Sequence, residues 1–193
     1  MASLVLASTS PYRRILLERL GLPFIVAKPD TDERPLRRES AQDLVKRLAE
    51  AKARAVAKQH PGAIIIGADQ VASLDDQILG KPGSHARAKA QLQSASGRQV
   101  DFYTGLCVFN SAIDTCHVEV IPYAVQFREL NDQQIDNYLQ REQPYDCAGS
   151  FKSEGLGTAL FAKHQGEDPT ALIGLPLIRL VALLEREGVA VLG

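Results

Sequence analysis

The sequence has 193 residues, of which 45% are hydrophobic and 23% charged, with a formal net charge of -1. This hydrophobic content excludes a disordered chain, and the near-neutral charge argues against a broad surface for nucleic acid. The three cysteines lack CxxC spacing and the four histidines are scattered, so we expect no disulfide framework and no zinc site, and we predict a reducing, cytoplasmic location. The apolar stretches near either end are too short or too interrupted to span a membrane or to act as a secretory signal.

The chain opens with a predicted strand–turn–helix unit. Residues 4–7 form an apolar run typical of a short buried strand. Ser10 is a favourable N-cap and Pro11 suits the first helical position, where no amide donor is needed. Gly21 then ends the predicted helix.

The turn before this first helix is the first candidate site. A capped helix start offers free backbone amides and the positive end of the helix dipole, both of which favour phosphate. Ser8 adds a hydroxyl, and Arg13 and Arg14 add permanently charged donors. The alternative is an ordinary capped helix with two solvated arginines.

A charged loop over residues 30–38 leads into a second helix, which Ser40 caps and which ends near residue 60. Glu33 in this loop is a candidate ligand for a hard cation, and a solvated loop acid is the alternative. Lys52 continues the apolar i,i+4 row of the helix, so it either snorkels to solvent or points at an anionic group.

The run over residues 63–69 predicts a strand buried on both faces that ends at Asp69. A carboxylate at a buried strand end needs a partner, and it could hold a divalent cation, activate water, or do both. A capping or turn aspartate is the alternative. Whether Glu33 or Glu50 would share a metal with Asp69 stays open.

The rest of the chain alternates helices and long strands, which predicts a mixed α/β sheet. Lys81 lies in a Gly-Lys-Pro loop, where it is either a phosphate ligand or a surface cation. The other predicted elements are a turn at 75–76, a helix over 84–95, strands over 100–109 and 115–127 joined by a turn, a short helix capped by Asn131, and a last helix over 177–187.

Several motifs together resemble the Maf family of nucleotide pyrophosphatases, and they follow one another in the family's order over nearly the whole chain. They occupy residues 6–17, 32–33, 48–53, 66–71, 79–82, 96–97, 103–105, 148–151 and 174–176. The resemblance implies an α/β fold in which helices flank a mixed central β-sheet, with two lobes around a deep cleft. It also implies that residues 1–193 form a single Maf-like domain.

The resemblance further implies hydrolysis between the α and β phosphates of a nucleoside triphosphate, with Mg²⁺ or Mn²⁺. Asp69 matches the family's catalytic proton acceptor and, with Glu33, its metal site. A homodimer is compatible with the resemblance, and neither nucleic acid nor a membrane is an expected partner. The residues that match phosphate-binding positions are Ser8, Arg13, Arg14, Lys52 and Lys81.

Three positions resemble the branch of the family that acts on 7-methyl-GTP, namely Tyr12, Gln70 and Glu154. The guanine ring of 7-methyl-GTP is cationic, so an aromatic face attracts it, and a carboxylate can accept both donors of its edge. A solvated helix residue and a solvated loop acid are the alternatives for Tyr12 and Glu154. The alternative functions are a Maf pyrophosphatase for dTTP/UTP or other non-standard nucleotides, and a non-catalytic regulator of cell division.

Overall fold

The computed structural model describes residues 3–193, and the chain divides into two compact units. Within the described residues, unit 1 comprises residues 3–69, 104–121 and 168–193, and unit 2 comprises residues 70–103 and 122–167. The chain therefore crosses between the units several times. Two compact units agree with the two lobes expected from the sequence.

One seven-stranded sheet has the order β2-β1-β3-β5-β6-β7, with β4 paired to β3. Strand β1 pairs in parallel with β2 and with β3, whereas β4 pairs antiparallel with β3 and β7 with β6. The sheet is therefore mixed, which confirms the predicted α/β class. The strands are β1 (Leu4–Ala7), β2 (Phe24–Ala27), β3 (Ile64–Leu74), β4 (Gln77–Leu79), β5 (Gln99–Asn110), β6 (Thr115–Phe127) and β7 (Phe161–Gln165).

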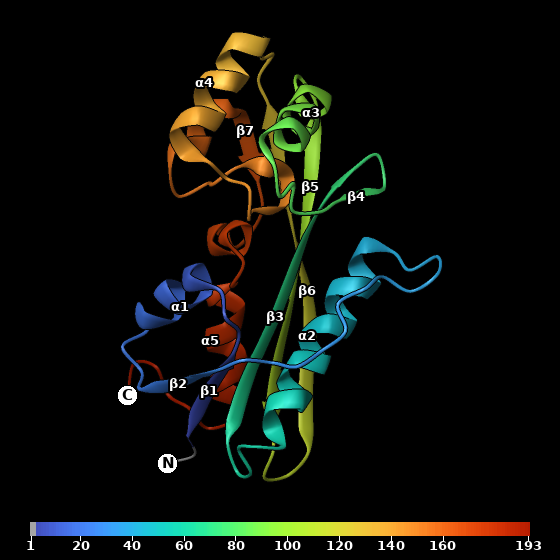
Figure 1. Ribbon diagram of the computed structural model, residues 1–193. Helices are drawn as coiled ribbons and strands as arrows, with labels where there is room; N and C mark the ends of the chain where they lie inside the picture. The colour runs from blue at the N-terminus through green and yellow to red at the C-terminus, as the bar shows by residue number, and fades with distance from the viewer. Residues whose placement is uncertain (1–2) are drawn as a thin grey trace. The chain divides into compact units, whose positions relative to one another are not determined.

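Five α-helices and three short 3₁₀ helices complete the fold (Figure 1). None of the helices within residues 3–193 combines the length and apolar character that a bilayer crossing requires. The helices are α1 (Pro11–Glu18), α2 (Ala41–Ala57), α3 (His85–Ala95), α4 (Asp132–Glu142) and α5 (Leu177–Arg186), with η1 (Ala148–Ser150), η2 (Leu156–Leu160) and η3 (Pro169–Ile173).

In unit 1, α2 lies directly on the sheet because two strands present glycine to it (Figure 1). A Cβ atom on Gly67 of β3 would lie 2.1 Å from the carbonyl oxygen of Ala49, and one on Gly105 of β5 would lie 2.1 Å from that of Val45. Only glycine permits this approach of two backbones. The helix is thereby held at a fixed height above β3.

The other face of the unit 1 strands packs against α1 and α5, since alternate residues of a strand point to opposite faces (Figure 1). Leu16 and Leu17 of α1 are buried, as are Leu180, Leu183 and Leu184 of α5. The strands are thus covered on both faces, which explains the continuous burial of residues 63–69.

Unit 2 has a core of its own built on aromatic rings. The ring of Phe151 meets those of Phe102, Phe127 and Phe161 edge to face, with centroids 4.9–5.7 Å apart. Helices α3 and α4 contact each other, and Lys89 of α3 bonds Asp136 of α4 at 2.7 Å.

Most predicted elements are confirmed, and Ser10, Ser40 and Asn131 each accept a backbone hydrogen bond as N-caps. One expectation is wrong: β3 does not end at Asp69 but continues to Leu74. The residues that follow, up to Leu74, are apolar enough to extend the strand as far as the turn at 75–76. Strands β2, β4 and β7 were not anticipated.

Candidate active site

The turn between β1 and α1 is fixed by the hydroxyls of two serines. Ser8 is buried, with 3% exposure, and its Oγ accepts a hydrogen bond from the amide of Ser10 at 3.2 Å. Ser10 in turn accepts from the amide of Arg13 at 3.4 Å. These hydroxyls fix the turn, so the first amides of α1 keep one direction.

Arg13 is the cation that this turn holds in place. Its Nε donates to the carbonyl oxygen of Gly174 at 2.8 Å, and its Nη1 donates to Ser8 Oγ at 3.4 Å. Burial lowers the pKa of Arg13, while the negative charges of Asp69 and Glu33 act in the opposite direction. Arg13 therefore interacts electrostatically with both acids. The turn that carries Ser8 and Arg13 and the aspartate of β3 belong to the same unit.

Lys52 lies between these same two acids. Its Nζ is 2.6 Å from Asp69 Oδ1 and 2.8 Å from Glu33 Oε1. Lys52 and Asp69 are 5% and 8% exposed, whereas the side chain of Glu33 is 60% exposed. Of the two possibilities for Lys52, the structure has it facing anionic groups rather than snorkelling.

The packing of α2 explains the contact between Lys52 and Asp69. Asp69 lies two residues after Gly67, on the same face of β3, and Lys52 lies on the same side of α2 as Ala49 and Ala53. Because Gly67 lets α2 approach β3 so closely, the ammonium reaches the carboxylate directly, at 2.6 Å. The site is thus a direct product of the helix–strand packing.

The carboxylates of Glu33 and Asp69 suit a hard divalent cation. An oxygen of each carboxylate contacts Lys52 Nζ, at 2.8 Å for Glu33 and 2.6 Å for Asp69, so the two carboxylates lie close to each other. Mg²⁺ typically takes one or two carboxylates and completes its shell with water and phosphate oxygens. Within residues 3–193, no group of three or more His, Cys, Asp or Glu side chains is arranged to hold a metal by itself. Substrate oxygens would have to complete the shell.

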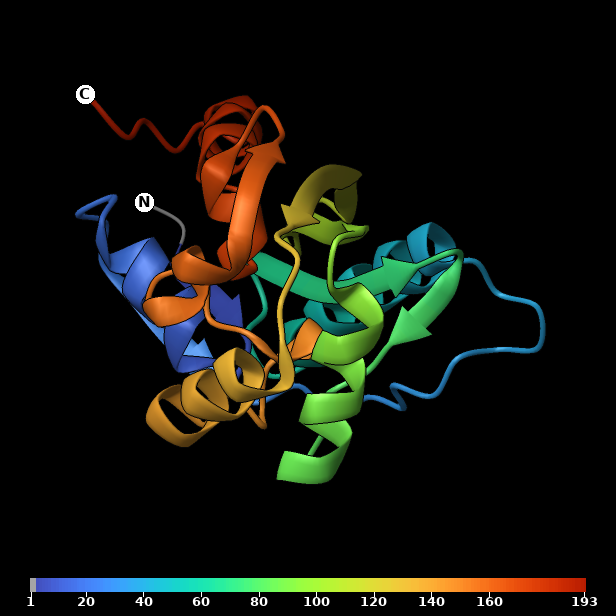
Figure 2. The same ribbon diagram turned by 90° about the horizontal axis from the view of Figure 1, so that it is seen from above.

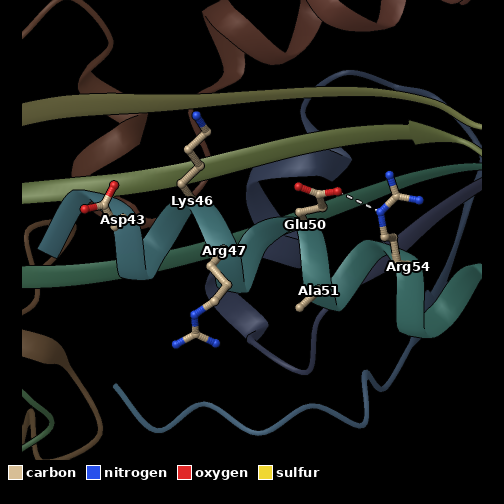
Figure 3. Close-up of a pocket in the computed structure, with 6 residues that line it drawn as sticks. All are labelled: Asp43, Lys46, Arg47, Glu50, Ala51 and Arg54. Atoms are coloured by element: carbon tan, nitrogen blue, oxygen red, sulfur yellow. Dashed lines mark hydrogen bonds and ion pairs between the residues drawn. The ribbon is translucent and has the colours of Figure 1, made fainter. Parts of the chain in front are cut away.

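Glu50 does not join these acids. It pairs with Arg54 one turn along α2, with 2.7 Å between Glu50 Oε1 and Arg54 Nε (Figure 3). Both residues line a hollow of about 430 Å³ on the outer side of α2, which neither Lys52 nor Asp69 lines. Of the two glutamates, Glu33 contacts the same ammonium as Asp69 and Glu50 pairs with Arg54, so sharing of a metal by Glu33 and Asp69 stays a prediction.

The loop that carries Glu33 is tied to α2 by Arg47. Its guanidinium bonds both carboxylate oxygens of Glu39 at 2.6 and 2.8 Å and the carbonyl of Arg34 at 3.1 Å. The hydrogen bonds from Arg47 lower the pKa of Glu39 to about 2. Figure 2 shows the loop between β2 and α2 projecting beyond the N-terminal end of the helix.

The remaining candidates lie on α1 or in unit 2. Arg14 is exposed on α1 and pairs with Glu18 at 3.0 Å, and Tyr12 on the same helix is partly buried. Gln70, Lys81 and Glu154 belong to unit 2, where Lys81 and Glu154 are exposed and Gln70 follows Asp69 in β3. The phosphate and specificity roles of these residues stay predictions.

Asp168, Thr104 and the Gly174 carbonyl surround this group and were not predicted from the sequence. Asp168 is 1% exposed, and Thr104 Oγ1 donates to the carbonyl of Ala171 at 2.9 Å. Thr104 and Gly174 lie in two of the motifs that resemble the Maf family, residues 103–105 and 174–176, and these motifs were the only indication in the sequence that the two residues matter. A backbone carbonyl carries no side-chain signature, so its partner Arg13 could not be inferred.

Comparison with known proteins places this geometry in context. The sequence model of a family described as "Maf-like protein" matches residues 3–187. A 7-methyl-GTP pyrophosphatase of Nitrosococcus oceani is 61% identical over 98% of this chain and 96% of its own length. One from Pseudomonas syringae pv. tomato is 56% identical, over 99% of this chain and all of the relative. The Ham1 protein of Staphylococcus aureus superposes with a TM-score of 0.54 at 17% identity, covering 96% of this chain and 99% of that one, which is a likeness of fold alone.

Proposed function

We propose that this chain, which belongs to the Maf-like protein family, hydrolyses the bond between the α and β phosphates of 7-methyl-GTP, yielding 7-methyl-GMP and diphosphate. Relatives of that name are 54–61% identical over nearly the full length of both chains. The observation that carries the proposal is the direct contact of Lys52 with the buried Asp69, with Arg13 within electrostatic reach.

The triphosphate would bind at the start of α1. The positive end of the helix dipole favours phosphate there, and Ser8 and Arg13 are already fixed in place by hydrogen bonds. Such fixed donors stabilise developing negative charge without having to reorganise during the reaction. By family resemblance, Arg14, Lys52 and Lys81 would supply further cationic contacts.

Asp69 would act on the attacking water. Its carboxylate takes a proton from water as the water oxygen forms a bond to the α phosphorus and the bond to the bridging oxygen breaks. The electron pair leaves with the β phosphate as diphosphate, and the cations around the triphosphate compensate for the charge. Lys52 contacts Asp69 through Oδ1, and we assign the attacking water to the other carboxylate oxygen.

We also infer that Mg²⁺ or Mn²⁺ takes part, held by Glu33 and Asp69. When bound, the ion would neutralise phosphate charge and increase the electrophilicity of the phosphorus. Because the Lys52 ammonium contacts both carboxylates, it would have to move towards the phosphate side as the ion enters. We therefore expect Lys52 and the metal to share the charge of the two acids.

For the base, we propose that Tyr12 stacks on the cationic ring, that Glu154 accepts its N1–H and N2–H donors, and that Gln70 contributes to the choice. A cation over an aromatic face gains about 0.5–2 kcal/mol. A pyrimidine lacks this pair of adjacent donors, so the same residues would disfavour dTTP and UTP.

The decisive experiment measures diphosphate release by the purified chain with Mg²⁺ or Mn²⁺. We expect 7-methyl-GTP to be cleaved faster than GTP, dTTP or UTP, and no turnover after metal removal by a chelator. Asp69→Asn should lose turnover, whereas Asp76→Asn, an exposed aspartate in the β3–β4 turn, should keep it. Preference for dTTP or UTP would refute the substrate assignment.

Two further measurements separate the rival functions. Tyr12→Arg and Glu154→Gln should each weaken the preference for 7-methyl-GTP, and an unchanged preference in both would contradict the base-recognition scheme. If Asp69→Asn abolishes turnover yet leaves an effect on cell division intact, the chain acts as a regulator without catalysis.

The predicted cytoplasmic location and the homodimer also remain proposals. The location is supported by the three cysteines, which are free thiols although Cys107 and Cys116 approach to 3.6 Å between sulfur atoms. Light scattering would decide the oligomeric state.

A further inference from the structure

A buried carboxylate that the proposed chemistry does not use organises the start of α5. Asp168 Oδ2 accepts from the amides of Ile178 and Arg179 at 2.8 and 3.4 Å. Its Oδ1 accepts from both the amide and the hydroxyl of Thr170, at 3.1 and 2.7 Å. Pro176, at the N-cap of α5, supplies no side-chain cap, so Asp168 performs this role from eight residues upstream. The positive end of the α5 dipole compensates for its buried charge.

The same contacts fix the turn that lies between Asp168 and α5. The amide of Gly174 donates to the carbonyls of Ala171 and Thr170 at 3.0 and 3.2 Å, and Gly174 adopts the left-handed φ of 115°. Thr104 Oγ1 holds the carbonyl of Ala171 from strand β5. The direction of the Gly174 carbonyl is therefore set by Asp168 from one side and by Thr104 from the other.

That carbonyl is the acceptor for Nε of Arg13, 161 residues earlier in the chain. With Nε fixed on Gly174 and Nη1 on Ser8, the planar guanidinium has one orientation, which sets the direction in which it would meet an anion. We propose that Asp168 is a positioning residue for Arg13, acting through the Gly174 carbonyl, for the reaction proposed above, on which this inference rests.

The test is a double-mutant cycle. Asp168→Asn keeps the shape of the side chain but replaces one acceptor with a donor that faces backbone amides. A small misplacement of a binding group can cost up to about a hundredfold, so we expect kcat/KM for 7-methyl-GTP to fall about tenfold or more. In an Arg13→Lys background, which keeps the charge but lacks the Nε donor, Asp168→Asn should change kcat/KM less than twofold. An equal fold-loss in both backgrounds would overturn the proposal.

Glu187→Gln provides the matched control for a general loosening of α5. Glu187 is an acid with a 5% exposed side chain, just beyond the other end of this helix, and it accepts from Asn110 Nδ2 at 2.6 Å and pairs with His117 Nε2 at 2.7 Å. We expect it to lower the melting temperature while kcat/KM stays within twofold of the parent. If it lowers kcat/KM as much as Asp168→Asn does, Asp168 has a structural role only.

A readout without substrate separates this proposal from the proposed function. The Arg13 Nε–H resonance, assigned by its loss in Arg13→Lys, should be protected from solvent exchange in the parent and become unprotected in Asp168→Asn. If the parent fails to cleave 7-methyl-GTP, the proposed function falls while this measurement still decides the positioning. A resonance that stays protected in Asp168→Asn refutes the positioning role.

Discussion

Replacing Gly67 by alanine should both destabilise the protein and impair the candidate site. The added Cβ would lie 2.1 Å from the carbonyl oxygen of Ala49, 3.0 Å from the amide nitrogen of Ala53 and 3.1 Å from its Cβ. Two of these three obstacles are helix backbone, so no side chain can rotate away and α2 itself must move. Overpacking of this kind costs about 1–3 kcal/mol, and we expect the upper part of that range.

For a chain of this length, a loss of about 2–3 kcal/mol lowers the melting temperature by about 4–12 °C. The displaced helix carries Lys52 away from Asp69, so diphosphate release should fall as well. Calorimetry and the diphosphate assay measure the two effects. Gly80→Ala is the matched control, because a Cβ at Gly80 would meet nothing within 4 Å. We take the error of a melting temperature as roughly 1 °C. If the melting temperatures of Gly67→Ala and Gly80→Ala agree within this error, the packing argument is wrong.

Three other predictions concern single contacts. Lys52→Met should lower the free energy of unfolding, measured by chemical denaturation, by about 3 kcal/mol, because it leaves the buried Asp69 carboxylate unpaired. Adding Asp69→Asn should recover part of this loss, and no recovery would contradict the pairing of Lys52 with Asp69. Arg47→Gln should raise the pKa of Glu39, measured by NMR titration, from about 2 towards its usual value of 4.5. The stabilisation by this pair is complete above the usual pKa and is lost as pH falls through about 2. An unshifted pKa in the variant would exclude Arg47 as the cause of the low pKa of Glu39. Asn131→Ala should lower the free energy of unfolding by about 1 kcal/mol, since it removes the capping box of α4, and an unchanged stability would show that the cap contributes nothing.

The elements that the sequence predicts best are those with a local physical cause. Ser10, Ser40 and Asn131 cap helices within three residues of themselves, so their role is visible in a short window. Strands β2 and β7 lie at the two ends of the sheet order and are largely exposed; β7 carries neither alternation nor an apolar run, whereas β2 is an apolar run of four residues, as long as that of β1, and could have been predicted. Their strand geometry comes from pairing with β1 and β6, which only the folded chain supplies.

The site shows the same division. The apolar row of α2 predicts that Lys52 either snorkels to solvent or points at an anionic group, and the isoleucine run predicts that Asp69 needs a partner. Neither pattern identifies Lys52 and Asp69 as partners, because their contact depends on the distance between α2 and β3. The capping of α5 by Asp168 was missed since a Pro176 N-cap leaves no local indication of where the acceptor comes from.

The bond between Arg13 and Gly174 also bears on how the protein acquires its site. A contact that closes a loop of 161 residues carries a large entropic cost, which only an otherwise folded chain can offset. During synthesis, the first helix emerges long before its acceptor exists. A growing chain can therefore form β1 and α1 early, but its guanidinium acquires a fixed orientation only after residue 174 has left the ribosome, so competence to bind anions would be among the last properties to mature.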